Sequence, residues 1–295
     1  MISLKKILII GATGLLGSTL FSIKSDKYQF FGTYNNNPKQ GLNHLDVTNK
    51  REVFEVIESV SPEIIIDAHV YKNMDLCETQ AQEAWNVNVQ GSKNIHMACN
   101  KIGAKYVYIS TDSVFDGKKS FYVEEDSTSP LNVYGRNKEE VENILKVSNS
   151  NYIIIRTSSL YSNRSSGGKV SFIQWLNEKI KIGGEIKLIS DQYTMPTLVN
   201  DLANIILELC DIDAQGIFNI AGPDCVSKYE FALKICKEFN LNSNMLKPVS
   251  HLQINQIANR PKMVKLSLNK IYKNIHRYPV DIENGLKILH FPVIL

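Results

Sequence analysis

Short apolar runs alternate along this chain with longer segments in which apolar residues recur at helical spacing. The runs are rich in branched residues and end at polar or glycine positions, which is typical of buried strands in a parallel sheet. The predicted strands cover residues 7–10, 29–33, 64–67, 106–110, 152–156, 187–189 and 217–220. The predicted helices include residues 15–25, 51–59, 81–101, 200–210 and 228–239. This order predicts right-handed βαβ units, and therefore an α/β fold with a doubly wound parallel sheet.

The alternation becomes less regular after about residue 158, where paired glycines at 167–168 and 183–184 mark loops. We therefore expect a sheet domain over residues 1–160 and a smaller C-terminal lobe over residues 161–295. With 295 residues, of which 43% are hydrophobic, the chain can bury a large core.

Composition and charge argue against several classes of function. The formal net charge is only +3 and the lysines are scattered, so no nucleic-acid partner is expected. No run reaches the roughly 18 apolar residues that span a bilayer, so no membrane partner is expected either. The first residues lead directly into the first predicted strand, which argues against a signal peptide and predicts a cytoplasmic protein.

Cysteine and histidine spacing gives no sign of a metal or disulfide framework. The five cysteines are odd in number and form no CxxC pair, so we expect reduced, mostly packed thiols. The six histidines show no HxxxH or His-Cys ligand spacing, so no metal site is predicted.

A glycine-rich loop follows the first predicted strand. Gly11, Gly14 and Gly17 have the spacing GxxGxxG, in the order of strand, tight turn and helix. In a dinucleotide-binding loop, Gly11 would permit the turn and Gly14 would let the backbone approach a pyrophosphate. Gly17 would let the helix pack closely while its first amides face the anion. The alternative is a turn whose small residues serve packing alone.

A second group of polar residues suits proton transfer. Tyr134 and Lys138 are four residues apart in segment 132–147, which is expected to be helical, so they share one helix face. An ammonium beside a phenol favours the phenolate, and we expect Lys138 to lower the pKa of Tyr134. Thr111 follows predicted strand 106–110, at the sheet edge where ligands bind. YxxxK alone is common on solvated helices, but this ordered set predicts a hydride-transfer enzyme.

These motifs resemble the extended short-chain dehydrogenases/reductases, and within them the dTDP-4-dehydrorhamnose reductase branch. The resemblance covers nearly the whole chain and rests on collinear motifs. They are the glycine loop at 11–17, LDVT at 45–48, VYKNMD at 70–75, CE at 77–78, VN at 87–88, Gly91, ISTD at 109–112, VFDG at 114–117, YGRNK at 134–138, RTS at 156–158, LY at 160–161, DQ at 191–192, PT at 196–197, DLA at 201–203, SKYEFA at 227–232 and RP at 260–261. The resemblance implies a Rossmann-type NADP-binding domain and a substrate-binding lobe that interleave, so the boundary near residue 160 is nominal.

The resemblance also implies roles for individual residues. Thr111, Tyr134 and Lys138 would form a catalytic triad. Tyr134 would donate a proton, Thr111 would polarise the carbonyl, and Lys138 would hold the nicotinamide ribose. Cofactor contacts are implied for Gly11, Thr13, Gly14, Leu15, Leu16, Asp46, Val47, Ala68, His69, Tyr71, Asn88, Tyr134 and Lys138.

Two of these cofactor residues have alternative roles. Asp46 lies where the family contacts adenine, but it could instead cap the following helix, although Thr48 suits that role better. Asn88 would brace the triad from the opposite helix, and the alternative is an exposed helix residue.

The cofactor is expected to be NADPH. An acidic residue after the second strand would hold the ribose 2′-hydroxyl of NADH, and residues 31–37 contain none. Nothing there repels a 2′-phosphate, and Lys39 is placed to reach one. NADH stays open as the alternative cofactor.

The substrate is expected to be a nucleotide-linked 4-keto-6-deoxy sugar that contacts Asp112, Ser113, Ser159 and Arg260. Arg260, with Lys262, would bind the diphosphate, because a guanidinium matches phosphate oxygens. Ser113 and Ser159 stand where the family carries aromatic residues, which predicts a substrate larger or more hydroxylated than 4-keto-rhamnose.

Two further departures concern chemistry at the strand ends. Asp67-Ala68-His69 replaces a more usual Asn-Ala-Ala, which changes the floor near the nicotinamide or the substrate. Ser113 after Thr111-Asp112 also replaces the glutamate that dehydratases use for elimination, so simple ketone reduction is favoured.

Two other function classes share the motif order. A regulatory protein resembling the methionine adenosyltransferase beta subunit would bind NADP without turnover, and the intact triad argues against it. A nucleotide-sugar epimerase would retain its cofactor tightly. The resemblance is compatible with a homodimer, but the sequence does not determine the oligomeric state.

Overall fold

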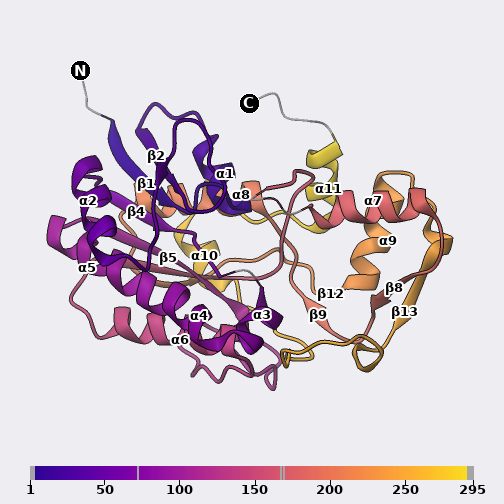
Figure 1. The fold of residues 1–295 in the computed structure, drawn as a ribbon. Helices are drawn as coiled ribbons and strands as arrows, with labels where there is room; N and C mark the ends of the chain where they lie inside the picture. Colours follow the sequence, from indigo (N-terminus) through magenta and orange to yellow (C-terminus); the bar gives the residue numbers. More distant parts are fainter. Residues whose placement is uncertain (1–3, 72, 167, 169, 291–295) are drawn as a thin grey trace.

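The protein is built on one parallel sheet of seven strands (Figure 1). The computed structural model describes residues 4–71, 73–166, 168 and 170–290. In spatial order the strands are β11 (Gly216–Asn219), β6 (Tyr152–Thr157), β5 (Lys105–Thr111), β4 (Ile64–Asp67), β1 (Lys5–Ile10), β2 (Tyr28–Tyr34) and β3 (Asn43–His44). All neighbouring strands in this sheet are parallel. The order runs outward from β1 on one side and from β4 on the other, which confirms the predicted doubly wound α/β fold.

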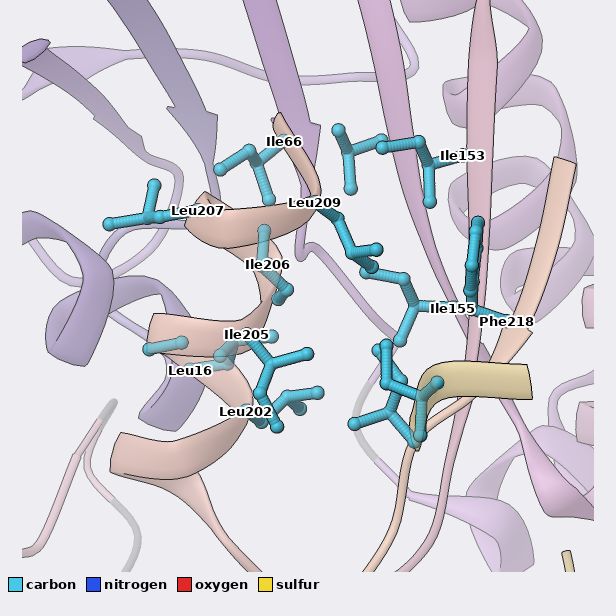
Figure 2. Close-up of a cluster of buried hydrophobic side chains, with 14 of the residues drawn as sticks. Leu16, Ile66, Ile153, Ile155, Leu202, Ile205, Ile206, Leu207, Leu209 and Phe218 are labelled. Atoms are coloured by element: carbon cyan, nitrogen blue, oxygen red, sulfur yellow. The ribbon is translucent and has the colours of Figure 1, made fainter. Parts of the chain in front are cut away.

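Helices cover both faces of the sheet, which explains why its strands are apolar on both sides. One face packs against α1, α8 and α10, and the other packs against α2, α5 and α6. Figure 2 shows Leu202, Ile205 and Leu209 of α8 beside Ile153 and Ile155 of the sheet. The helix bounds are Leu15–Phe21 (α1), Val199–Asp211 (α8), Asn269–Asn274 (α10), Lys50–Val60 (α2), Ser92–Ile102 (α5) and Val133–Lys146 (α6).

A smaller lobe lies at the other end of the molecule, at the right in Figure 1. Its helices pack with the strand pair β8–β13 around a separate apolar cluster. These elements are α7 (Phe172–Ile182), α9 (Lys228–Glu238), α11 (Ile282–His290), β8 (Ile186–Ile189) and β13 (Leu246–Val249). Shorter strand pairs are β7 (Leu160–Tyr161) with β10 (Thr197–Leu198) and β9 (Tyr193–Thr194) with β12 (Val226–Ser227). Residues beyond 160 contribute to both parts, because α8 and β11 return to the main sheet.

The predicted strands are all present, but the one at 187–189 pairs with β13 in the smaller lobe and not with the main sheet. The predicted helix 81–101 is three consecutive segments, namely α4 (Ala81–Trp85), a π-helical segment η1 (Asn86–Gly91) and α5. A π-helical segment has wider turns than the 3.6-residue period, so the sequence pattern could not separate it. Helix α1 is also shorter than predicted and ends at Phe21.

The helix cap predicted at Thr48 is wrong. Asn49 caps α2, and its side-chain oxygen accepts the Glu52 N–H at 3.3 Å. Asparagine is at least as good an N-cap residue as threonine, so residue type alone did not decide between these adjacent positions.

A buried ion pair joins α6 to strand β6 of the sheet. The Arg156 guanidinium on β6 donates two hydrogen bonds to the Glu142 carboxylate, at 3.0 and 2.6 Å, and neither side chain is exposed. The Ser110 hydroxyl on β5 donates to the same carboxylate at 2.6 Å. Burial tends to raise the pKa of Glu142, but Arg156 and Ser110 outweigh it and hold that pKa below its usual value. The pair therefore fixes the helix that carries Tyr134 and Lys138.

Glu142→Ala should lower the free energy of unfolding by about 3 to 5 kcal/mol, because Arg156 would stay buried without its counter-ion. The lowered folded-state pKa means that the wild type keeps this stabilisation above the ordinary glutamate value of 4.5 and loses it as the pH falls towards the folded value. Urea unfolding over this pH range measures both effects. Glu140→Ala, on a more exposed part of α6, is the control and should change stability by less than about 0.5 kcal/mol. Equal effects of the two variants would show that the pair does not anchor α6.

Candidate active site

The predicted site residues gather at the carboxyl ends of three neighbouring strands. Gly11 follows β1, Ala68 follows β4, and Thr111 ends β5. The chain winds in opposite directions on the two sides of β1 and β4, and open α/β sheets bind ligands outside such a switch point.

The glycine loop has the geometry that the sequence predicts. Gly11 has a φ of +82°, in the left-handed region that favours glycine. A Cβ on Gly17 would lie 2.2 Å from the Gly11 carbonyl oxygen, so α1 can pack against the turn only with glycine there. The Gly14 N–H donates to the Gly11 carbonyl at 3.0 Å and closes the turn.

The residues around the start of α1 have different environments. Thr13 and Leu15 line an open cavity of about 450 Å³. Leu16 packs into the sheet core and is buried. A cofactor at this loop could therefore contact Leu16 only through its backbone.

Three other predicted cofactor residues, Asp46, Val47 and Asn88, are held by contacts within the protein. Asp46 accepts hydrogen bonds from the Thr48 N–H and hydroxyl, at 2.9 and 2.7 Å, and so forms a tight turn. Val47 is buried beside η1. Asn88 on η1 is also buried, and its side-chain oxygen accepts the Tyr71 N–H at 2.8 Å. Asn88 therefore fixes the segment that follows β4 and is not the exposed helix residue of the alternative interpretation.

A fully buried carboxylate lies at the end of β4. Asp67 accepts hydrogen bonds from His69 Nδ1, from the Tyr106 hydroxyl at 2.5 Å and from the Ser92 hydroxyl at 3.0 Å. Burial tends to raise the pKa of Asp67, but His69 and the Lys138 charge outweigh it and keep that pKa below its usual value. Sequence reasoning missed Tyr106 and Ser92, because neither belongs to a recognised motif.

His69 connects this carboxylate to the glycine loop. Its Nε2 lies 2.9 Å from the Val87 carbonyl oxygen, so each ring nitrogen faces an oxygen acceptor. Its backbone lies against the loop, since a Cβ on Gly11 would be 3.0 Å from the His69 Cα. The His69 side chain therefore joins Asp67 to η1, while the backbone of the same residue contacts the glycine loop.

Tyr134 lies beside Thr111, as predicted. Its ring packs with Tyr71 and Cys77, and its hydroxyl interacts with Thr111. Burial and the negative charge of Asp112 raise the pKa of Tyr134, although the Thr111 hydrogen bond lowers it. The expectation of a lowered phenol pKa is therefore wrong for this structure.

The contacts of Lys138 explain why the pKa of Tyr134 is not lowered. Its ammonium donates to the Ile109 carbonyl oxygen at 2.8 Å and lies 4.7 Å from the centroid of the Tyr108 ring. Burial lowers the pKa of Lys138 to about 8, although the charge of Asp67 raises it. The helical spacing places Lys138 near the site, but its interactions are with the sheet and not with the phenol.

Gly135 allows α6 to begin against the end of β5. A Cβ on Gly135 would lie 2.3 Å from the Ser113 carbonyl oxygen. Asn132 caps the helix by accepting the Gly135 N–H at 2.7 Å. Because Tyr134 is adjacent to Gly135, this close approach sets the phenol beside Thr111. Sequence reasoning missed this role, although a glycine in the first turn of a helix is an intrinsically unfavourable choice and was a usable signal.

The predicted substrate residues do not form one group. The Ser158 hydroxyl donates to Asp112 at 2.5 Å, and the Ser113 hydroxyl lies 3.4 Å from the same carboxylate. Ser113 is buried, whereas Ser159 is exposed and has a φ of +29°. The residue that contacts Asp112 from this segment is therefore Ser158, which sequence reasoning did not select.

Arg260 is paired within the protein. Its guanidinium donates to the Asp75 carboxylate on α3 (Met74–Thr79) at 2.9 Å. Lys228 interacts electrostatically with both groups. Lys262 is exposed, and its carbonyl accepts the Tyr193 N–H. A diphosphate would have to compete with Asp75 for Arg260.

The sequence pattern of the RmlD substrate binding domain family matches residues 5–290. The chain belongs to this family. A dTDP-4-dehydrorhamnose reductase from Aggregatibacter actinomycetemcomitans is 30% identical, over 96% of this chain and 97% of that protein.

Solved structures agree with this membership. The crystal structure of dTDP-4-dehydrorhamnose reductase from Bacillus anthracis, in complex with NADP, has a TM-score of 0.88 and 30% identity. The match covers 98% of this chain and 99% of that one. These similarities confirm the predicted resemblance and the predicted class, a nicotinamide-dependent oxidoreductase of the RmlD family.

One relative matches an alternative considered above. The methionine adenosyltransferase 2 subunit beta of Rattus norvegicus is 29% identical, over 90% of this chain and 81% of that protein. Proteins named for different roles therefore have sequences similar to this chain.

In the described ranges, no cluster of three His, Cys, Asp or Glu side chains could hold a metal ion. None of the helices among the described residues has the length and apolar character needed to cross a bilayer.

Gly135→Ala should reduce turnover at least about tenfold, because the added methyl collides with the Ser113 carbonyl and moves Tyr134 away from Thr111. Gly103→Ala is the control. Its Cβ meets nothing within 4 Å, so it carries only the cost of a left-handed alanine, far from the site. Steady-state kinetics of both variants, with melting temperatures to compare their stabilities, check the expectation. Full activity of Gly135→Ala would show that this contact does not position the phenol.

Proposed function

We propose that the protein is an NADPH-dependent reductase of a nucleotide-linked 4-keto-6-deoxy sugar, similar to dTDP-4-dehydrorhamnose reductase. The observation that carries the proposal is the juxtaposition of Thr111 and Tyr134 at the carboxyl edge of the sheet. Lys138 lies on the same helix as Tyr134, and the glycine loop follows a strand of the same edge. Family membership and the NADP in the Bacillus anthracis structure support this assignment.

Each residue has a separate role in the reduction of the ketone. Bound NADPH supplies a hydride from its nicotinamide C4 to the keto carbon. Tyr134 gives its proton to the carbonyl oxygen as that oxygen gains charge, and Thr111 donates a hydrogen bond to the same oxygen. The raised pKa of Tyr134 suits this direction, because the phenol keeps its proton until the substrate accepts it.

Other residues would bind the two ligands. Lys138 would hold the nicotinamide ribose, and the backbone of the glycine loop would face the pyrophosphate. Asp112, held by Ser158, lies where it can orient a sugar hydroxyl beside Thr111. Arg260 would bind the diphosphate of the sugar nucleotide after releasing Asp75.

A panel of nucleotide-linked 4-ketosugars, assayed for NADPH oxidation, tests the proposal and separates it from the alternatives. A reductase consumes one NADPH for each sugar reduced. A regulatory protein like the methionine adenosyltransferase beta subunit would bind NADPH without consuming it. An epimerase would convert the sugar with no net loss of NADPH.

Tyr134→Phe should lower turnover by roughly two to four orders of magnitude, the usual contribution of a positioned acid. Its dissociation constant for NADPH should change little, because the ring is kept. Lys138→Met should weaken both turnover and NADPH binding, since Lys138 is proposed to hold the ribose. Stopped-flow turnover and fluorescence titration measure the two effects. Retention of most reductase activity by Tyr134→Phe would rule out the proton-donor role.

The pH dependence of kcat/KM should reflect the protonation of Lys138. Its pKa of about 8 means that the ammonium is present below that pH and is lost as the pH rises through it. The kcat/KM of the wild type should therefore fall above about pH 8, whereas Lys138→Arg should keep its charge and remove this decline. An identical alkaline limb in both proteins would assign the titration to another group.

A further inference from the structure

An open cavity of about 450 Å³ lies between the two parts of the protein, beside the glycine loop. One wall comes from Thr13 and Ser18 at the glycine loop, and another from the segment 37–39 that follows β2. The third wall comes from residues 162–166, which follow β7 and lead towards the smaller lobe.

The polar residues that line this cavity are basic or neutral. Its described polar residues are seven serines and threonines, three asparagines and two cations, Lys39 and Arg164. No acidic residue is among the described lining residues. Neither cation forms an ion pair with any side chain in the ranges that the structure describes. Most of the lining hydroxyls donate within the protein, so the feature that suits a phosphate group is the pair of cations without carboxylate partners.

The segment that carries Arg164 is held in place from both sides. The Ser166 hydroxyl donates to the Thr13 carbonyl oxygen at 2.7 Å, which fastens the segment to the glycine loop. The Asn163 side chain donates to the Leu289 carbonyl oxygen on α11 at 2.6 Å. The Ser165 hydroxyl donates to the Gln174 side chain on α7 at 2.5 Å. The backbone at Arg164 is therefore positioned, while its side chain stays exposed and available.

We propose that Arg164 and Lys39 bind the 2′-phosphate of the dinucleotide from opposite walls of this cavity. The assignment rests on the proposed function, because it names a contact to the same cofactor. The 2′-phosphate is favoured over the pyrophosphate because the loop after β2, which supplies Lys39, is where Rossmann folds discriminate at the adenosine ribose. A residue from beyond the NADP-binding domain thus takes part in the choice of NADPH over NADH.

The test compares four ligands whose phosphates differ. Dissociation constants for NADPH, NADH, 2′,5′-ADP and 5′-ADP are measured with the full chain by titration calorimetry. Arg164→Gln and Lys39→Gln should each weaken NADPH and 2′,5′-ADP about tenfold or more, the usual scale for a charge-assisted contact. Binding of NADH and 5′-ADP should stay within about twofold, and Arg164→Lys should recover part of the loss.

Lys181→Gln is the matched control, because Lys181 is an exposed cation on α7 that does not line the cavity. It should leave all four dissociation constants unchanged. Equal weakening of NADPH and NADH by Arg164→Gln would place Arg164 on the pyrophosphate and overturn the assignment. Tight NADPH binding that is unaffected by Arg164→Gln would refute this inference and leave the proposed function intact. If the wild type bound none of the four ligands, both proposals would be wrong.

Discussion

The buried negative charge of Asp67 constrains the whole site. A carboxylate removed from water costs several kcal/mol unless it is paired and hydrogen-bonded. Asp67 accepts hydrogen bonds from His69, Tyr106 and Ser92. The charge of Lys138 on α6 stabilises it further. His69 in turn lies against the Gly11 turn. Satisfying one charge therefore ties the glycine loop, the end of β4 and helix α6 into a single arrangement.

A second set of contacts positions α6 against the sheet. The Glu142 and Arg156 pair holds the helix to β6, and Gly135 lets its first turn reach the Ser113 carbonyl. Together they bring Tyr134 to Thr111. They also leave the phenol partly buried near Asp112, which raises its pKa and keeps a protonated group at the sheet edge. The same packing that builds the site thus favours a proton donor over a proton acceptor in the state described.

Much of this could be predicted from the sequence, because periodicity and glycine chemistry act locally. The apolar runs marked the strands, the GxxGxxG spacing gave the turn at Gly11, and an i,i+4 pair placed Tyr134 and Lys138 on one helix. What could not be predicted depends on contacts between distant segments. The direction of the Lys138 ammonium is set by Ile109 and Asp67, and the position of Arg164 is set by Ser166 on Thr13. The π-helical turns of η1 likewise could not be predicted, because a pattern analysed at the α-helical period does not distinguish them.

The proposed reaction transfers a hydride from a nicotinamide to the carbonyl carbon of a sugar nucleotide. It is tested most directly with NADPH that carries deuterium at both nicotinamide C4 positions and with dTDP-4-dehydrorhamnose or a related ketosugar. The account predicts one deuterium on C4 of the product sugar for each NADPH oxidised, detected by NMR and mass spectrometry. NADPH binding without oxidation across the ketosugars, or a converted sugar without deuterium, would contradict it.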